Sequence, residues 1–140
     1  MVFEMNLNPA PFEKIRSGSK DVELRLYDEK RKRLNIGDEI IFTNLSDKDE
    51  QITVRINALY RYGSFWELFE EIPPQRCGCD AGISVEAAAA GMRKYYSKQQ
   101  EHQYGVLGIR MELVDLQEAK LIQEKQEEAM LEHLFPDGMK

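Results

Sequence analysis

The chain has few of the residues that build metal centres or disulfide frameworks. Its 140 residues include two cysteines, Cys77 and Cys79, and two histidines, His102 and His133. A structural zinc site usually takes four ligands, and a second cysteine pair is missing. We therefore expect no metal site, and we expect both cysteines to be reduced and to line a loop.

Long apolar runs are missing too. The longest last only a few residues, whereas a membrane-spanning helix needs about 20. The first residues, "MVFEMNLNPAPFEK", show neither the basic start nor the apolar stretch of a signal peptide. With 42% hydrophobic and 31% charged residues, the composition is typical of a single globular domain. We expect a cytoplasmic protein with no membrane partner.

Several catalytic and nucleotide-binding motifs do not occur in the sequence, namely GxSxG, HExxH, the Walker loop and GxGxxG. No cofactor is therefore indicated. The net charge of −6 argues against a protein that coats nucleic acid non-specifically. The charge is uneven, however, because residues 13–33 carry +3 and the rest of the chain −9. A local basic patch on an acidic body can hold a phosphate-bearing ligand, although a solvated surface explains the same pattern.

The residue patterns indicate a mixed fold. Alternation of apolar and polar residues predicts five strands, at 2–7, 21–27, 38–44, 51–62 and 104–114. Helical periodicity and capping residues predict helices at 8–18, 64–72, 84–97 and 115–134, with a polar turn at 45–50. Strands joined by short turns, without a regular βαβ rhythm, favour an α+β fold with a small barrel or mixed sheet.

The same patterns predict which side chains face the core or cap a helix. The expected inward residues include Phe12, Ile15, Leu107, Ile109, Met111 and Leu113. Two capping boxes are expected, one pairing Ser64 with Glu67 and the other pairing Asp115 with Glu118. Along 51–62, Leu59 is the exception to the polar side of the strand.

The stretch 17–27, "SGSKDVELRLY", is the best candidate for a binding site. Glu23 and Arg25 share the polar face of a predicted strand and stand about 7 Å apart along it. Lys20 lies just before the start of that strand and shortly after Gly18. Because glycine has no side chain, a ligand can approach the backbone closely there. A carboxylate beside two cations stays ionised, with its pKa lowered. Ion pairs on a half-exposed strand explain the same pattern.

Tyrosines form a second candidate group. Tyr62 lies at a strand-to-helix turn, and Tyr95 and Tyr96 precede the last strand. Aromatic rings beside a basic patch can hold splayed bases by stacking, so these three tyrosines are candidate ligand-binding residues. Packing in the core is the alternative, and it is favoured for Phe65, which occupies a helical core position.

The segment 15–44, "IRSGSKDVELRLYDEKRKRLNIGDEIIFTN", resembles the start of ASCH-domain proteins, which group with the PUA-like folds. The shared pattern is G-x-K-x-x-E-x-R, followed by a Gly-Asp pair at 37–38; here its residues are Gly18, Lys20, Glu23 and Arg25. The likeness covers about residues 3–113, and the segments "SFWELFEEI" and "MRKYYSKQQEHQYGVLGI" look like those of larger bacterial members. The resemblance implies a PUA-like β-barrel of about five strands with surrounding helices, and an RNA or nucleotide-like ligand in a cleft.

The resemblance also implies an alternative activity. One group of small ASCH proteins is similar to amidohydrolases that deacetylate N4-acetylcytidine, using a Lys and a Thr three residues later with a downstream Glu. Lys20 matches that Lys, but Glu23 stands in place of the Thr, and a carboxylate does not replace a hydroxyl nucleophile. Other members are reported to cleave RNA, for which Lys20 and Glu23 are candidate catalytic residues. The sequence leaves open whether the protein is an enzyme.

The end of the chain lies outside the resemblance. We expect one domain at 1–114 and a helical extension at 115–140. That extension is acidic and only moderately amphipathic, so it can pack on the barrel, stand free, or pair two copies of the chain in a homodimer. A protein-interaction module is accordingly a third functional hypothesis.

Overall fold

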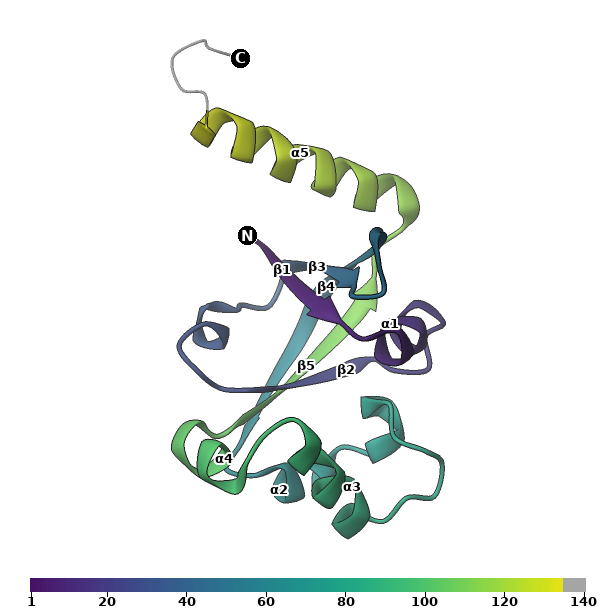
Figure 1. Cartoon of the computed structure of the whole chain (residues 1–140), viewed down its shortest axis with the longest axis vertical. Helices are drawn as coiled ribbons and strands as arrows, with labels where there is room; N and C mark the ends of the chain where they lie inside the picture. The colour runs from purple at the N-terminus through teal and green to yellow at the C-terminus, as the bar shows by residue number, and fades with distance from the viewer. Residues whose placement is uncertain (135–140) are drawn as a thin grey trace.

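Five strands form one curved sheet in the computed structural model, which describes residues 1–134. They are β1 (Val2–Leu7), β2 (Val22–Leu26), β3 (Glu39–Asn44), β4 (Asp47–Tyr62) and β5 (Val106–Leu113). Their order in the sheet is β1-β3-β4-β5-β2, so β1 and β2 are its two edges. Strand β1 runs parallel to β3, and the other neighbours are antiparallel. The expected α+β fold of about five strands with surrounding helices is confirmed, and its sheet forms a half-barrel (Figure 1).

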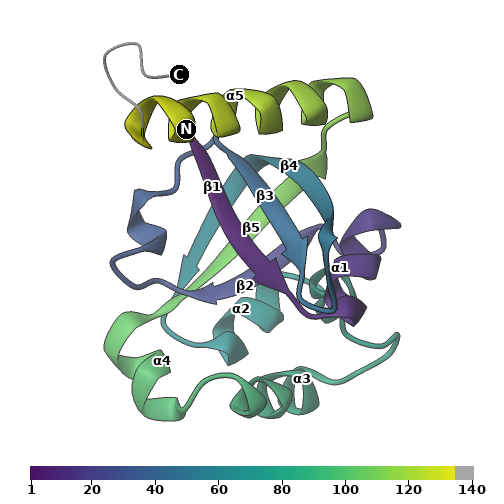
Figure 2. The same cartoon turned by 45° about the horizontal axis from the view of Figure 1, so that its top comes forward.

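Helices lie at both ends of this sheet. They are α1 (Pro9–Arg16), α2 (Phe65–Glu71), α3 (Val85–Gly91), α4 (Lys98–Tyr104) and α5 (Leu116–Leu134), with three 3-10 turns, η1 (Arg31–Arg33), η2 (Pro74–Cys77) and η3 (Met92–Lys94). Helices α2, α3 and α4 gather at one end, and α5 crosses the opposite end near the N-terminus (Figures 1 and 2).

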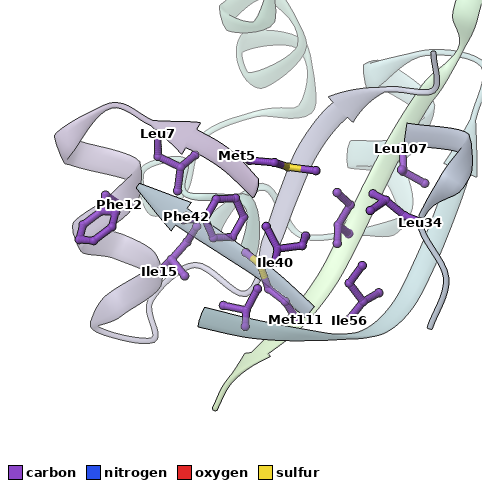
Figure 3. Packing of buried hydrophobic residues seen from close by; sticks show 12 residues of the cluster. Met5, Leu7, Phe12, Ile15, Leu34, Ile40, Phe42, Ile56, Leu107 and Met111 are labelled. Atoms are coloured by element: carbon purple, nitrogen blue, oxygen red, sulfur yellow. The ribbon is translucent and has the colours of Figure 1, made fainter. Parts of the chain in front are cut away.

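The first core cluster lies between the strands and α1. Period-two alternation directs one face of each strand into it, and α1 contributes Phe12 and Ile15, which are buried as expected. Figure 3 shows side chains of this cluster packed together. Its other members are Met5, Leu7, Leu34, Ile40, Phe42, Val54, Ile56, Leu107, Ile109 and Met111.

The second core cluster joins β2 to the helices at the far end. Val22, Leu24 and Leu26 of β2 pack with α2, α3 and the start of β5. The helices contribute chiefly Phe65, Leu68, Phe69, Ala88, Ala89 and Met92. Because this cluster occupies the apolar face of β2, the polar face carrying Glu23 and Arg25 is directed away from it.

A bulge in β4 explains the irregular place of Leu59. The pairing with β5 shifts between Ile56 and Ala58, so Asn57 has no partner in the register. One extra residue reverses which side chains face each side of a strand. Leu59 therefore packs on the first core cluster, whereas Tyr60 and Tyr62 pack on the second.

The helix expected at 84–97 is wrong as a single element. Helix α3 ends at Gly91, a residue that is costly inside a helix. A 3-10 turn then buries Met92 in the second core cluster. Ser97 begins the separate helix α4 through a capping box with Gln100, a signal that the sequence reading overlooked.

Three smaller expectations are also corrected. Strand β4 begins at Asp47, so most of the expected polar turn at 45–50 belongs to that strand. Leu113 is exposed, because β5 extends past the core at that point. Ser64 accepts from the Glu67 amide as a cap should, but the Glu67 carboxylate accepts from the Gly63 amide, one residue outside the expected box.

The second expected capping box is half formed. Asp115 accepts from the amide of Glu118 at 2.9 Å, but the Glu118 side chain pairs with Arg55 of β4. Ala119 is buried, and the side-chain amide of Gln123 donates to the Thr53 hydroxyl at 3.1 Å. Helix α5 therefore packs on the sheet over its first turns.

The division of the chain at residue 114 stays a prediction, and residues 135–140 of the expected extension lie outside the described residues. Within residues 1–134, none of the helices combines the length and the apolar character needed to cross a lipid bilayer.

Candidate functional site

A cleft of about 480 Å³ opens beside the two edge strands of the sheet. One wall comes from the end of β1 and from α1, and another from β2, including Lys20 just before that strand. The loop 77–80, α3 and the segment 94–96 complete the walls. The cleft, as named from here on, is thus built by segments that lie far apart in the sequence.

Lys20, Glu23 and Arg25 come together in this cleft. The Lys20 Nζ atom lies 2.9 Å from Glu23 Oε1, and Arg25 Nη2 lies 3.0 Å from Glu23 Oε2. The three side chains are 9%, 5% and 16% exposed. These charges therefore do not form a solvated surface patch.

The Glu23 carboxylate is fully engaged by its own chain. Oε1 accepts from Lys20 and from the Leu24 amide at 3.2 Å, and Oε2 accepts from Nε and Nη2 of Arg25 at 3.2 and 3.0 Å. A carboxylate offers about four lone-pair positions, and all are used. Burial raises the pKa of Glu23, but the opposing charges and hydrogen bonds of Lys20 and Arg25 outweigh it, so the pKa is lowered. Glu23 therefore orients two cations.

The two cations keep donors that this pairing does not use. An ammonium has three N–H donors and a guanidinium five. Arg25 Nη2 also donates to the Asn6 carbonyl oxygen at 3.1 Å, which links the edge strands β2 and β1. Among the described residues, no acceptor is recorded for Arg25 Nη1 or for the other two N–H groups of Lys20. These donors are available to an anionic or carbonyl-bearing ligand.

The loop 77–80 is held over Lys20 by two anchors. Arg76 forms a two-pronged pair with Asp21, with N–O distances of 3.0 and 2.9 Å, and Lys14 Nζ donates to the Gly78 carbonyl oxygen at 2.7 Å. Gly78 has φ +94°, and a Cβ atom there would lie 2.9 Å from Lys20 Cδ. Both the positive φ and the close approach to Lys20 favour glycine here.

Both cysteines line the cleft. Cys77 is buried, and burial raises the pKa of its thiol to about 12. Cys79 is half-buried, and burial raises its pKa as well, although nearby Lys20 and Lys14 oppose the shift. Within residues 1–134, no three His, Cys, Asp or Glu side chains are grouped as a metal site would need.

The candidate tyrosines separate into two groups. Tyr95 and Tyr96 line the cleft, where Tyr95 is exposed and Tyr96 stacks on Phe65 with ring centroids 5.8 Å apart. Burial raises the pKa of Tyr96, against the opposing effect of nearby arginines. Tyr62 lies outside the cleft lining and donates to a Glu71 carboxylate oxygen at 3.2 Å.

Gly18 is also outside the lining. It has φ +86° at the exit of α1, where its amide donates to the Ile15 carbonyl oxygen, so its conformation serves the turn. Gly78 takes the place beside Lys20 that the sequence reading gave to Gly18. The sequence signal for Gly78 was its position between two cysteines in "RCGCD". Lys14, which also lines the cleft, belongs to the basic segment 13–33, whereas no sequence signal pointed to Lys94, another lining residue.

The fold and sequence have known relatives. A family model described as the ASCH domain matches residues 5–115. The crystal structure of a hypothetical protein, PH0355, has a TM-score of 0.72 and 33% identity, covering 81% of this chain and 100% of that one. The solution structure of protein PF0455 from Pyrococcus furiosus has a TM-score of 0.64 and 31% identity, covering 82% and 99%.

A more distant likeness concerns the fold alone. The crystal structure of a ZmASCH mutant protein from Zymomonas mobilis has a TM-score of 0.52 and 17% identity, covering 81% of this chain and 73% of that one. A comparison with curated proteins found no match. Because a Pyrococcus protein is among the relatives, the likeness to bacterial members expected from the sequence stays a prediction.

Proposed function

Because this chain belongs to the ASCH domain family, we propose that it binds single-stranded RNA or a nucleotide-like ligand in the cleft. ASCH domains are typically tied to RNA binding. Lys20 and Arg25 hold a phosphate or the acceptor edge of a base, and Glu23 fixes the position of both. Tyr95 and Tyr96 offer ring surfaces at the rim. Gly18 and Tyr62 have no direct part in this proposal.

The observation that carries the proposal is the Lys20–Glu23–Arg25 group, in which Lys20 and Glu23 are buried and Arg25 is half-buried. Removing three charges from water is costly, and such a group seldom adds net stability over apolar packing. It does place two cations in one recess with donors to spare. The three formal charges of this group sum to +1, and Lys14, Lys94 and Asp80 bring the cleft lining to +2, which suits an anionic ligand such as a phosphodiester.

The geometry favours binding over hydrolysis. A general base must accept a proton from its substrate, yet the lone pairs of Glu23 are occupied and its pKa is lowered. The Lys20 Nζ atom lies 2.9 Å from Glu23 Oε1 in an ion pair, where it serves as a cation rather than as an attacking group. Deacylation of N4-acetylcytidine and cleavage of RNA are therefore the alternatives that the test below can reveal.

The test compares the cleft lysine with an exposed lysine on α5. Binding of cytidine monophosphate and of oligocytidylate is measured by NMR titration and fluorescence anisotropy for wild type, Lys20→Met and Lys120→Met. Methionine keeps the apolar stem of Lys20 and removes the ammonium group. A hydrogen bond to a charged group contributes about 1.5–3 kcal/mol. Lys20→Met should therefore lower the affinity for both ligands at least about tenfold. Lys120→Met should not.

Equal affinity of wild type and Lys20→Met for both ligands would overturn the proposal. So would a failure of folded wild-type protein to bind either of them. Product from N4-acetylcytidine or short RNA in the same samples would replace binding by hydrolysis as the function.

We also propose that α5 can pair two copies of the chain. Its outer surface exposes several apolar side chains, namely Leu116, Leu121, Met130, Leu131 and Leu134. Light scattering of Leu131→Glu beside wild type tests this, because a buried charge at an apolar interface should shift a dimer to the monomer mass. An unchanged mass for both would remove the proposal. Cytoplasmic placement stays a prediction.

A further inference from the structure

A second recess, about 500 Å³ in volume, lies on the other side of α3. Its walls come from the start of α2, from α3 with Arg93, and from α4. We call it the second groove and define it by Trp66, Ala89, Ala90, Arg93, Lys98 and His102. None of these residues belongs to the G-x-K-x-x-E-x-R pattern, and the proposed function uses none of them.

The second groove offers a ring surface and an exposed cation, Lys98, together. Trp66 is 45% exposed although it is a large aromatic residue. Lys98 and His102 are exposed beside it. The carboxylate of Glu101, which also lines the groove, is neutralised because it pairs with Arg93 and accepts from the Phe65 amide at 2.5 Å. The Glu86 carboxylate is exposed there and can accept from a base amino group.

Helix α3 is the partition between the cleft and the second groove. Its alanine run, 87–90, places Ala87 and Ala88 in the cleft and Ala89 and Ala90 in the groove. Small side chains on both sides make this partition thin. The next turn repeats the division, because Arg93 lines the groove while the adjacent Lys94 lines the cleft. The two recesses are therefore separated by this helix and the turn that follows it.

We propose that the second groove binds a further nucleotide of the same single-stranded RNA that occupies the cleft. A base stacks on the Trp66 indole, and Lys98 contacts the adjoining phosphate. Stacking on an aromatic side chain accepts any base, and a nearby cation holds the backbone. The strand crosses α3 and η3 between the recesses. This inference rests on the proposed function, and it predicts that an oligonucleotide binds more tightly than a mononucleotide.

Trp66 provides a direct readout because it is the only tryptophan in the chain. It lines the second groove and is not part of the cleft lining. Oligocytidylate should therefore quench tryptophan fluorescence, since a stacked base lies against the indole. NMR titration should show cytidine monophosphate binding in the cleft, and this binding should leave the tryptophan fluorescence unchanged.

Variants separate the two recesses. Trp66→Ala should weaken oligocytidylate by about 5- to 150-fold and leave cytidine monophosphate unaffected, whereas Trp66→Phe should restore part of the affinity. Lys98→Ala should make the plot of log affinity against log salt less steep by about 0.7, the value for one phosphate contact with a single strand. The matched control is Lys125→Ala, which replaces an exposed lysine on α5. It should change neither the affinity for oligocytidylate nor its salt dependence.

The outcomes distinguish this inference from the proposed function. If Trp66→Ala binds oligocytidylate like wild type while Lys20→Met is impaired, the second groove is not a binding site and the cleft proposal stands. Quenching by cytidine monophosphate alone would overturn the division of labour between the recesses. If Lys20→Met binds both ligands normally, the proposed function fails, and quenching of Trp66 would then report an independent site.

Discussion

The cleft and the second groove lie on opposite sides of one thin helix, and they hold their charges differently. In the cleft, the buried Lys20 and Glu23 and the half-buried Arg25 are paired with one another. In the second groove, the charged side chains of Lys98 and Glu86 are exposed on the surface. A buried charge depends on its partners for stability, whereas an exposed charge is solvated by water. Substitutions should therefore change stability in the cleft and affect mainly binding in the groove.

The largest difference is expected between the two glutamates. Glu23→Ala leaves two cations buried without their counter-ion, and breaking a buried pair in this way costs about 3–5 kcal/mol. Glu86→Ala removes an exposed carboxylate and should change stability by less than about 0.5 kcal/mol. Urea unfolding of both variants measures the two values. Similar losses would show that burial does not distinguish the two recesses.

The pH dependence of stability sharpens the same contrast. The pKa of Glu23 is lowered in the folded protein, so its ionised form stabilises the fold above the unfolded pKa, about 4.3. That contribution disappears as the pH falls through the lower, folded pKa. The unfolding free energies of wild type and Glu23→Gln should therefore differ fully at pH 7 and converge below about pH 4. A difference that is constant with pH would contradict this, with Glu86→Gln measured alongside as the baseline.

Two glycines separate backbone strain from contact with Lys20. Gly78 and Gly82 both have positive φ, at +94° and +76°. Alanine at either position should cost about 1–2 kcal/mol of stability. Only at position 78 does the added Cβ meet Lys20, because Gly82 has nothing within 4 Å. We expect Gly78→Ala to weaken cytidine monophosphate about fivefold and Gly82→Ala to leave it unchanged. If the two variants bind cytidine monophosphate equally well, the Lys20 side chain can move aside for the added Cβ without loss of binding.

The smallest expected effect concerns the two cysteines of the cleft. With a pKa of about 12, only about one Cys77 thiol in ten thousand is ionised at pH 8. Cys79 is half-buried and lines the cleft. Iodoacetamide at pH 8 should therefore modify Cys79 first, and cytidine monophosphate should slow that reaction. Mass spectrometry of peptides containing each cysteine tests the order, and faster modification of Cys77 would contradict it.

Local patterns in the sequence predicted much of the sheet. Alternation of apolar and polar residues is a consequence of the strand's own geometry, so the β2 residues Val22, Leu24 and Leu26 were correctly placed on one face. Leu59 and Leu113 were harder. The first depends on a bulge at Asn57 in the pairing of β4 with β5, and the second on where the core ends. Both are properties of the assembled sheet.

Helical patterns were less informative between residues 84 and 104. The alanine-rich stretch and the following residues suit a helix locally, yet the chain breaks after Gly91. Burial of Met92 in the second core cluster and the capping box at Ser97 favour the break. Tertiary packing thereby placed Tyr95 and Tyr96 at the cleft and Arg93 in the second groove.

By itself, the sequence determined that Glu23 and Arg25 share a strand face and that Lys20 stands next to them, because side-chain direction along a strand has a period of two. Only the tertiary structure decided that this face borders a recess. The loop 77–80 and helix α3, more than fifty residues further along the chain, pack beside β2 and exclude water from the three charges. Long-range packing sets the solvent around a residue, and a local pattern cannot encode it.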